Sequence, residues 1–99
     1  MTDYKGKILL VDDDPGLLKL LSIRLKTEGY DIAAVESGMK ALATATNFRP
    51  DLIITDLKMD QMNGIELLQE VQQRWPGLRV LLMTAHGTIP DAVKATQSG

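Results

Sequence analysis

Short, largely apolar runs alternate with amphipathic stretches along this chain, and this alternation restricts its fold more than any other feature of the sequence. The runs occupy residues 8–11, 31–35, 52–56 and 80–83, and apolar residues recur at helical spacing between them. Strands that alternate with helices indicate a parallel sheet with helices on both faces. A chain of 99 residues has room for one domain. We therefore predict a single α/β domain.

Local signals indicate where the helices begin and end. Asp14 and Pro15 form a pair that favours a helix start, and Gly29 is placed to cap the end of that helix. Ser37 can cap the next helix, over residues 38–47. Further signals are a turn at Asn63-Gly64, a helix over residues 65–74, a stop at Pro76-Gly77 and a capping box at residues 88–91 that begins a last helix.

Composition excludes several classes of protein. Hydrophobic residues make up 44% of the chain, which is enough for a core, and the absence of cysteine excludes disulfides and thiolate metal sites. A formal net charge of -2 provides no basic surface for direct binding of nucleic acid. The apolar runs are far too short to span a membrane, and the first residues lack a secretory signal. We expect a cytoplasmic protein.

Acidic residues follow two of the predicted strands, at the edge where the carboxyl ends of the strands meet. Right-handed crossovers favour the strand order 2-1-3-4, in which the first and third strands are neighbours. Asp12, Asp13 and Asp14 follow the first strand, and Asp56 ends the third. Two carboxylates about 4 Å apart repel by roughly 1 kcal/mol in water and about 4 kcal/mol at a lower effective dielectric, so a divalent cation is expected between them. Mg²⁺ suits such a set of oxygen ligands.

Simpler roles are open for several residues near this edge. Thr84 follows the fourth strand and can donate a hydrogen bond to a phosphoryl oxygen, or it can bond its own loop as a turn residue. Asp14 is expected to cap the helix that follows it, and Asp56 taken alone can equally be a solvated turn residue. The residues interpreted as loop residues are Lys58, Asp60, Asn63 and His86.

Three motifs together resemble the receiver domain of two-component response regulators. They are ILLVDDD at residues 8–14, LIITDLKM at residues 52–59 and LMTA at residues 82–85. The resemblance covers essentially all of the chain. The sequence around the first and third motifs is most similar to receivers of NtrC-type transcriptional regulators, particularly GlrR-like ones. It implies a flavodoxin-like, doubly wound parallel sheet of the kind seen in chemotaxis receivers.

The resemblance also implies residue roles and partners. Asp56 would be the phosphoacceptor that takes a phosphoryl group from a sensor histidine kinase, in a signalling domain that assists its own phosphorylation and dephosphorylation without being an enzyme. Asp12, Asp13, Asp56 and the backbone carbonyl of Lys58 would hold Mg²⁺, and Thr84 would be the switch hydroxyl. Receivers of this type control an ATPase module and a helix-turn-helix DNA-binding module in the same chain.

Two departures from the family pattern concern the end of the chain and one loop. The family continues with a fifth strand, which carries a lysine, and a fifth helix, and neither is within residues 1–99. We therefore expect a receiver domain that is truncated at its C-terminus, with the strand at residues 80–83 exposed as a sheet edge and prone to strand-exchanged dimers. Asp60 stands where receivers commonly have proline.

Two other functions compete with this interpretation. A haloacid-dehalogenase-like phosphatase would use Asp12 as nucleophile, Asp14 as acid-base group and Thr84 in its second motif, but it leaves Asp56 without a role. A nonphosphorylated interaction module would keep the fold and dock partners through its last helix.

Overall fold

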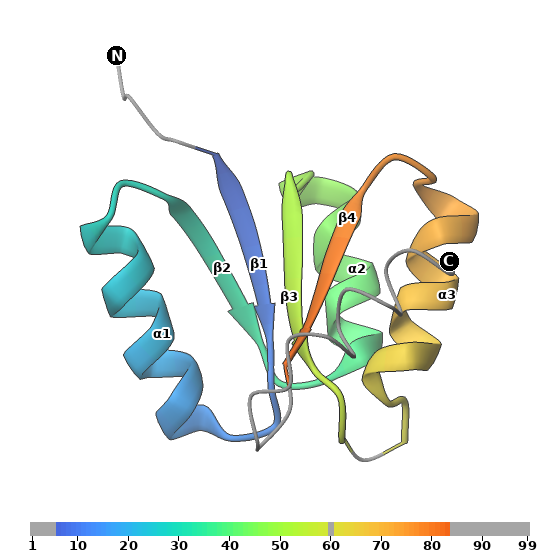
Figure 1. Ribbon diagram of the computed structural model, residues 1–99, viewed down its shortest axis with the longest axis horizontal. Helices are drawn as coiled ribbons and strands as arrows, with labels where there is room; N and C mark the ends of the chain where they lie inside the picture. Colours follow the sequence, from blue (N-terminus) through green and yellow to red (C-terminus); the bar gives the residue numbers. More distant parts are fainter. Residues whose placement is uncertain (1–5, 60, 84–99) are drawn as a thin grey trace.

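The computed structural model describes residues 6–59 and 61–83, which form seven helices and strands (Figure 1). In chain order these are β1 (Lys7–Val11), α1 (Pro15–Thr27), β2 (Asp31–Val35), α2 (Gly38–Phe48), β3 (Leu52–Asp56), α3 (Gly64–Arg74) and β4 (Arg79–Met83). The predicted alternation of strands and helices is confirmed for these residues. The expected last helix lies outside the described residues. So do Thr84, His86 and Asp60.

The four strands form one parallel sheet in the order β2-β1-β3-β4, as predicted. Figure 1 shows all four arrows pointing toward the same edge. Register is set residue by residue: Val11 is paired with Thr55, and Asp56 is paired with Met83. The carboxyl ends of β1, β3 and β4 therefore lie side by side at one edge of the sheet.

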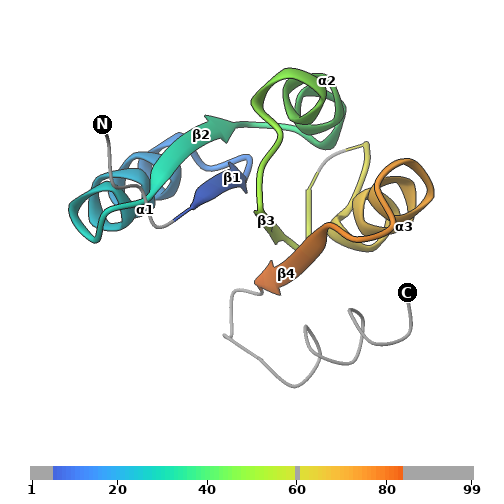
Figure 2. The same cartoon turned by 90° about the horizontal axis from the view of Figure 1, so that it is seen from above.

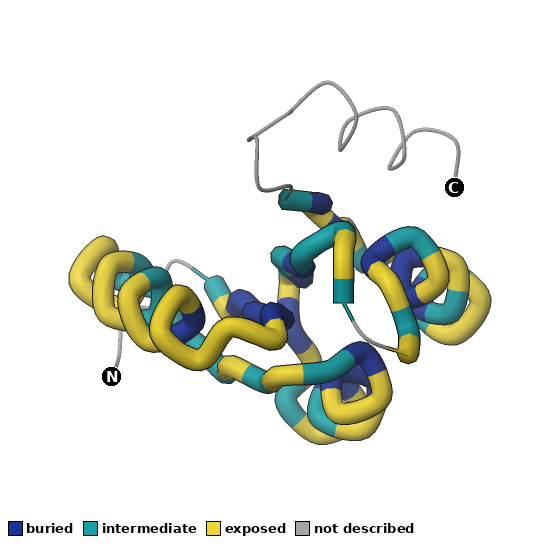
Figure 3. The backbone as a smooth tube through the Cα atoms, turned by 90° about the horizontal axis from the view of Figure 1, so that it is seen from below, coloured by how far each residue is buried: buried dark blue, intermediate teal, exposed yellow. Residues whose placement is uncertain are grey.

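Helices cover both faces of the sheet, with α1 on one side and α2 and α3 on the other (Figure 2). Side chains alternate along β1, so Leu9 and Val11 belong to the core under α2 and α3, whereas Ile8 and Leu10 pack with α1. Figure 3 shows the buried segments concentrated in the central strands and on the inner sides of α2 and α3, while most of α1 is exposed. The double coverage explains why β1 is a continuous apolar run.

The two ends of α1 follow the predicted signals. One carboxylate oxygen of Asp14, Oδ1, accepts hydrogen bonds from the amides of Gly16 (3.0 Å) and Leu17 (3.3 Å), so this side chain is the N-cap. At the other end Gly29 has a φ of +102°, and the amides of Gly29 and Tyr30 donate to carbonyls in the last turn. This is a Schellman arrangement, which glycine adopts without steric strain.

The start of α3 differs from the sequence-based expectation. Asn63 is not part of a separate turn, because it is the N-cap of α3 and Gly64 is the first helical residue. The Asn63 side chain accepts from the Glu66 amide at 2.8 Å, and the Glu66 carboxylate accepts from the Asn63 amide at 3.0 Å. This reciprocal capping box begins the helix immediately after the loop, so the predicted turn and helix start are one feature.

None of the helices among the described residues has both the length and the apolar character needed to cross a membrane. Within the same residues β2 and β4 are the two edges of the sheet.

A matched pair of isoleucine substitutions tests the position of the core. Ile53 in β3 is fully buried, whereas Ile23 in α1 is 55% exposed. Removing one methyl group from a filled core leaves a small cavity, so we expect Ile53→Val to lower the free energy of unfolding by about 0.5–1.5 kcal/mol. Ile23→Val should change it by less than about 0.5 kcal/mol. Urea denaturation measures both, and equal losses in the two variants would contradict this placement of the core.

Candidate metal centre at the carboxyl end of the sheet

Three aspartates meet at the carboxyl edge of the sheet. Asp12, Asp13 and Asp56 each offer a carboxylate oxygen, and these atoms all lie within 4.8 Å of one another. Asp12 and Asp13 directly follow β1, and Asp56 is the last residue of β3. The parallel pairing of Val11 with Thr55 brings the two segments together. The predicted grouping of these three residues is confirmed.

The three carboxylates differ in their surroundings. Asp12 is only 4% exposed, and its Oδ1 atom accepts a hydrogen bond from the Asp14 amide at 2.8 Å. Asp13 is exposed and Asp56 is half-buried. The Lys58 amide approaches Oδ1 of Asp56 only at 3.5 Å, at the limit of a hydrogen bond. Asp56 is therefore the carboxylate that combines partial burial with weakly engaged oxygen atoms.

Among the described residues, no ion pair neutralises the negative charge of the cluster. Burial raises the pKa of Asp12 above its ordinary value of 3.8, the hydrogen bond from the Asp14 amide opposes this rise, and the charge of Asp56 adds to it. Within the part of the chain that the structure describes, the only ion pair joins Arg74 to Glu70 on α3. A cation bound between the three carboxylates would relieve both the repulsion and the cost of burying Asp12.

The donor set fits Mg²⁺ better than a softer metal. All three side chains supply carboxylate oxygen, which hard cations prefer, and no nitrogen or sulfur ligand joins the cluster from residues 6–59 or 61–83. Two shallow grooves adjoin the site: one of about 370 Å³ includes Asp12, Asp13 and Asp56, and one of about 510 Å³ runs from Asp13 to Lys58 and Asn63. These grooves leave space beside the carboxylates for water and a small anionic group.

The other residues singled out from the sequence have different positions. Asp14 borders the groove, but its Oδ1 atom is engaged as the N-cap of α1, which confirms the capping interpretation. The same engagement leaves Asp14 poorly placed as the acid-base group of a phosphatase. Lys58 is exposed in the loop after β3, next to the cluster. Thr84 lies outside the described residues, immediately after Met83, which is paired with Asp56.

A buried hydroxyl behind the site was not anticipated from the sequence. Thr55 is fully buried, and its hydroxyl donates to the Asp56 carbonyl at 3.1 Å and lies 3.9 Å from the sulfur of Met59. It therefore connects the end of β3 to the loop that follows. The signal was present in the sequence as a polar residue inside an apolar strand, where a buried hydroxyl needs a partner.

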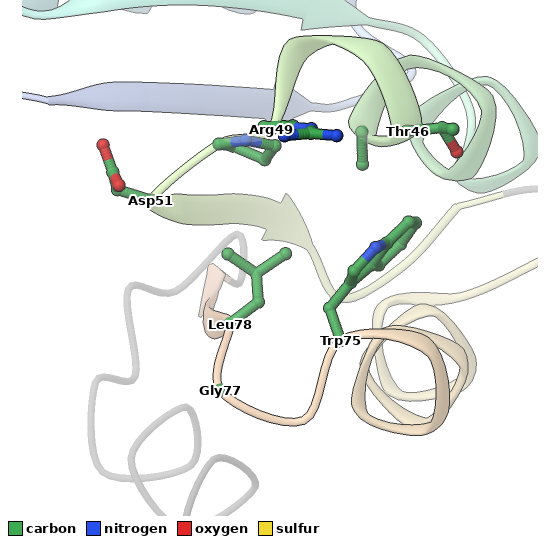
Figure 4. Close-up of a pocket in the computed structure, with 8 residues that line it drawn as sticks. Thr46, Arg49, Asp51, Trp75, Gly77 and Leu78 are labelled. Atoms are coloured by element: carbon green, nitrogen blue, oxygen red, sulfur yellow. The ribbon is translucent and has the colours of Figure 1, made fainter.

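A cavity larger than either of these grooves lies at the opposite end of the sheet. It measures about 620 Å³, lies between the C-terminal ends of α2 and α3, and has Arg49 and Trp75 on opposite walls (Figure 4). Its one acidic side chain, Asp51, accepts a hydrogen bond from the Lys7 amide at 2.8 Å. Cavity size therefore does not locate the metal centre, whereas the convergence of carboxylates does.

Comparisons with known proteins agree with this geometry. A family model described as a response regulator receiver domain matches residues 8–99. The transcriptional regulatory protein GlrR of Escherichia coli (strain K12) is 52% identical over 99 residues, which are 100% of this chain and 22% of GlrR. The chain thus spans about a fifth of the length of this relative.

Solved structures show the same fold. The chemotaxis response regulator CheY4 of Vibrio cholerae superimposes with a TM-score of 0.80 at 29% identity, over 94% of this chain and 78% of CheY4. NtrX from Brucella abortus, crystallised in complex with ADP, superimposes with a TM-score of 0.84 at 30% identity, over 100% of this chain and 22% of NtrX.

The raised pKa of Asp12 predicts how stability depends on pH without metal. The folded state holds the Asp12 proton more tightly than the unfolded state does. The contribution of this group to the free energy of unfolding should therefore fall as pH rises from about 4 through the raised pKa. We expect Asp12→Asn, whose side-chain oxygen can still accept the Asp14 amide, to be more stable than the parent at pH 7 and to lose this advantage below about pH 4. Thermal unfolding in a chelator measures both.

The control for this prediction is Asp31→Asn, at the opposite end of the sheet. The prediction is wrong if Asp12→Asn is less stable than the parent at pH 7, or if its advantage persists unchanged in acid.

Proposed function

Because the chain belongs to the response regulator receiver family, we propose that Asp56 accepts a phosphoryl group at a Mg²⁺ site formed with Asp12 and Asp13. The observation that carries the proposal is the convergence of these three carboxylates at the carboxyl edge of the sheet, within 4.8 Å of one another. The motif resemblance to receivers of GlrR-like regulators is confirmed by the 52% identity to GlrR.

Asp56 is the best nucleophile of the three carboxylates. Asp12 is buried and its Oδ1 atom accepts a hydrogen bond from the Asp14 amide, so it is less accessible to a phosphodonor than Asp56 is. Asp13 is exposed, and its place on the open side of the groove suits a ligand that holds a hydrated cation. The burial of Asp56 is intermediate between theirs, and its weakly engaged carboxylate is accessible and already partly desolvated.

The proposed reaction transfers a phosphoryl group from a histidine nitrogen of the donor to a carboxylate oxygen of Asp56. One carboxylate oxygen of Asp56 forms a bond to phosphorus while the bond from phosphorus to a phosphohistidine nitrogen breaks, and the electron pair of that bond returns to the imidazole. Bound Mg²⁺, held by Asp12, Asp13, Asp56 and the Lys58 carbonyl, would offset the charge on the transferring group. The chain's own contribution is to hold the nucleophile in line and to hold the acidic ligands together at one edge of the sheet.

The donor and the output follow from the same proposal. The phosphohistidine belongs to a sensor histidine kinase, and the aspartyl phosphate is then read by transcriptional effector modules of the ATPase and DNA-binding kind. Thr84, as the switch hydroxyl, would donate to a phosphoryl oxygen and couple the site to the segment after β4. The name of GlrR, a transcriptional regulatory protein, supports this class of output.

Phosphodonor labelling tests the acceptor. With Mg²⁺ and a small-molecule donor such as acetyl phosphate, the parent should incorporate phosphate that is labile in both acid and base, as acyl phosphates are, and Asp56→Asn should incorporate none because its amide is not a nucleophile. Asp31→Asn, remote from the cluster, is the control and should be labelled like the parent. Equal labelling of Asp56→Asn and the parent would show that another residue is the acceptor.

Neighbouring aspartates provide a matched test of the metal ligands. Asp13 and Asp14 are both exposed, but only Asp13 belongs to the cluster, while Asp14 caps α1. We expect Asp13→Asn to weaken Mg²⁺ binding by about tenfold or more, because it removes an oxygen ligand and its charge. Asp14→Asn removes the same charge but retains a capping side chain, so its effect should be much smaller. Isothermal titration measures both, and equal effects would mean that Asp13 acts only through its charge.

A further inference from the structure

The first turn of α3 lies unusually close to the end of β3. Gly64, the first residue of α3, is buried, and its amide donates to the Leu57 carbonyl at 2.9 Å. A Cβ atom at this position would lie 2.5 Å from the Asp56 carbonyl oxygen and 3.0 Å from both Leu57 Cα and Leu82 Cδ2. The backbone φ of Gly64 is not positive, so space rather than conformation requires glycine here.

The atoms in the way of a Cβ are tied to the sheet. The Asp56 carbonyl accepts the hydroxyl of buried Thr55 at 3.1 Å, and the Leu57 amide donates to the Met83 carbonyl at 2.8 Å. Because these backbone groups are held by β3 and β4, they cannot yield without breaking sheet contacts. A side chain at position 64 would instead push the start of α3 away from β3.

We propose that Gly64 is a positioning residue of the phosphoacceptor site: the absence of a side chain lets α3 lie against the Asp56 carbonyl and sets the loop that carries Lys58. This inference rests on the proposed function, since Lys58 matters through its carbonyl, the one backbone ligand proposed for Mg²⁺. The loop is short and closed at both ends, by the Leu57 amide on β4 and by the Gly64 amide on Leu57. Because Leu57 is held by β4, a shift of α3 would be taken up between Leu57 and Gly64, in the stretch that contains Lys58.

Two other glycines supply matched controls. Gly38 is also buried and is also the first residue of a helix, α2, but a Cβ there would meet the Met62 side chain, with its sulfur at 2.7 Å. The flexible end of the methionine can adopt another rotamer, and its Cβ atom, at 3.2 Å, need give by only a few tenths of an ångström, so the backbone displacement required is smaller than at position 64. Gly77 is exposed, and nothing lies within 4 Å of the position of its Cβ.

The first test needs no metal, and its first measurement needs only the parent protein. In the parent, NMR should show a nuclear Overhauser effect between the α protons of Gly64 and Leu57, because a Cβ on Gly64 would stand 3.0 Å from Leu57 Cα. In metal-free Gly64→Ala, the amide resonances of residues 56–58 should shift, and in Gly38→Ala the shifts should centre on Met62. Absence of the Overhauser effect in the parent overturns the inference.

The second test measures function against stability. We expect Gly64→Ala to raise the Mg²⁺ dissociation constant about 10- to 100-fold, the range for residues that orient metal ligands, and to raise the Mg²⁺ concentration needed for half-maximal labelling of Asp56. Gly38→Ala and Gly77→Ala should keep the parent's Mg²⁺ affinity. Thermal unfolding of the same samples separates the fraction folded from the affinity of the folded protein. If Gly64→Ala unfolds in plain buffer, all samples are compared in trimethylamine N-oxide, which favours the compact state.

The outcomes distinguish the inference from the proposed function. If the parent binds Mg²⁺ and is labelled on Asp56, but folded Gly64→Ala has the same Mg²⁺ affinity, only the positioning role is overturned. If the parent neither binds Mg²⁺ nor is labelled, the proposed function fails and the positioning role fails with it. Weakened Mg²⁺ binding in Gly64→Ala alone, at equal folded fraction, supports the inference.

Discussion

The parallel pairing of β1 with β3 is the contact on which the site depends. It places the residue after Val11 beside the residue after Thr55, so that Asp12 and Asp56 share one edge although they are distant in sequence. The hydrophobic burial of both strands, on both faces of the sheet, stabilises this pairing. The apolar core thus holds together charges that would otherwise separate, and the resulting repulsion is what makes a cation favourable there.

Burial then differentiates carboxylates that are chemically identical. The inward position of Asp12 raises its pKa, whereas Asp14, two residues later, is exposed and engaged as the cap of α1. Asp13 is exposed between them, and Asp56 faces them from β3. One run of three aspartates therefore provides a buried carboxylate, an open carboxylate and a helix cap. The three aspartates differ in burial and in hydrogen bonding because they form the short connection between the end of β1 and the start of α1.

The loop after β3 is a second organising element. Backbone hydrogen bonds attach it to β4 and to the first turn of α3, and the Thr55 hydroxyl holds its starting carbonyl. Capping of α3 by Asn63 and Glu66 defines where the helix begins, and Gly64 allows that beginning to lie on the strand. Fold and site are coupled here, because the contacts that end the loop also determine what the loop presents to the carboxylates.

Most of the architecture was predictable from the sequence, since alternation of apolar runs with helical patterns, Asp14 before Pro15 and Gly29 after α1 are local signals with local causes. The strand order followed from the handedness of crossovers, and the grouping of Asp12, Asp13 and Asp56 followed from the strand order. The buried hydroxyl of Thr55 and the capping box at Asn63 had local signals in the sequence, a polar residue inside an apolar strand and a glutamate three residues after an asparagine, which were not used. The tight contact of Gly64 with the end of β3 was not predictable, because a sequence determines which residues are apolar or acidic but not how closely two backbones approach.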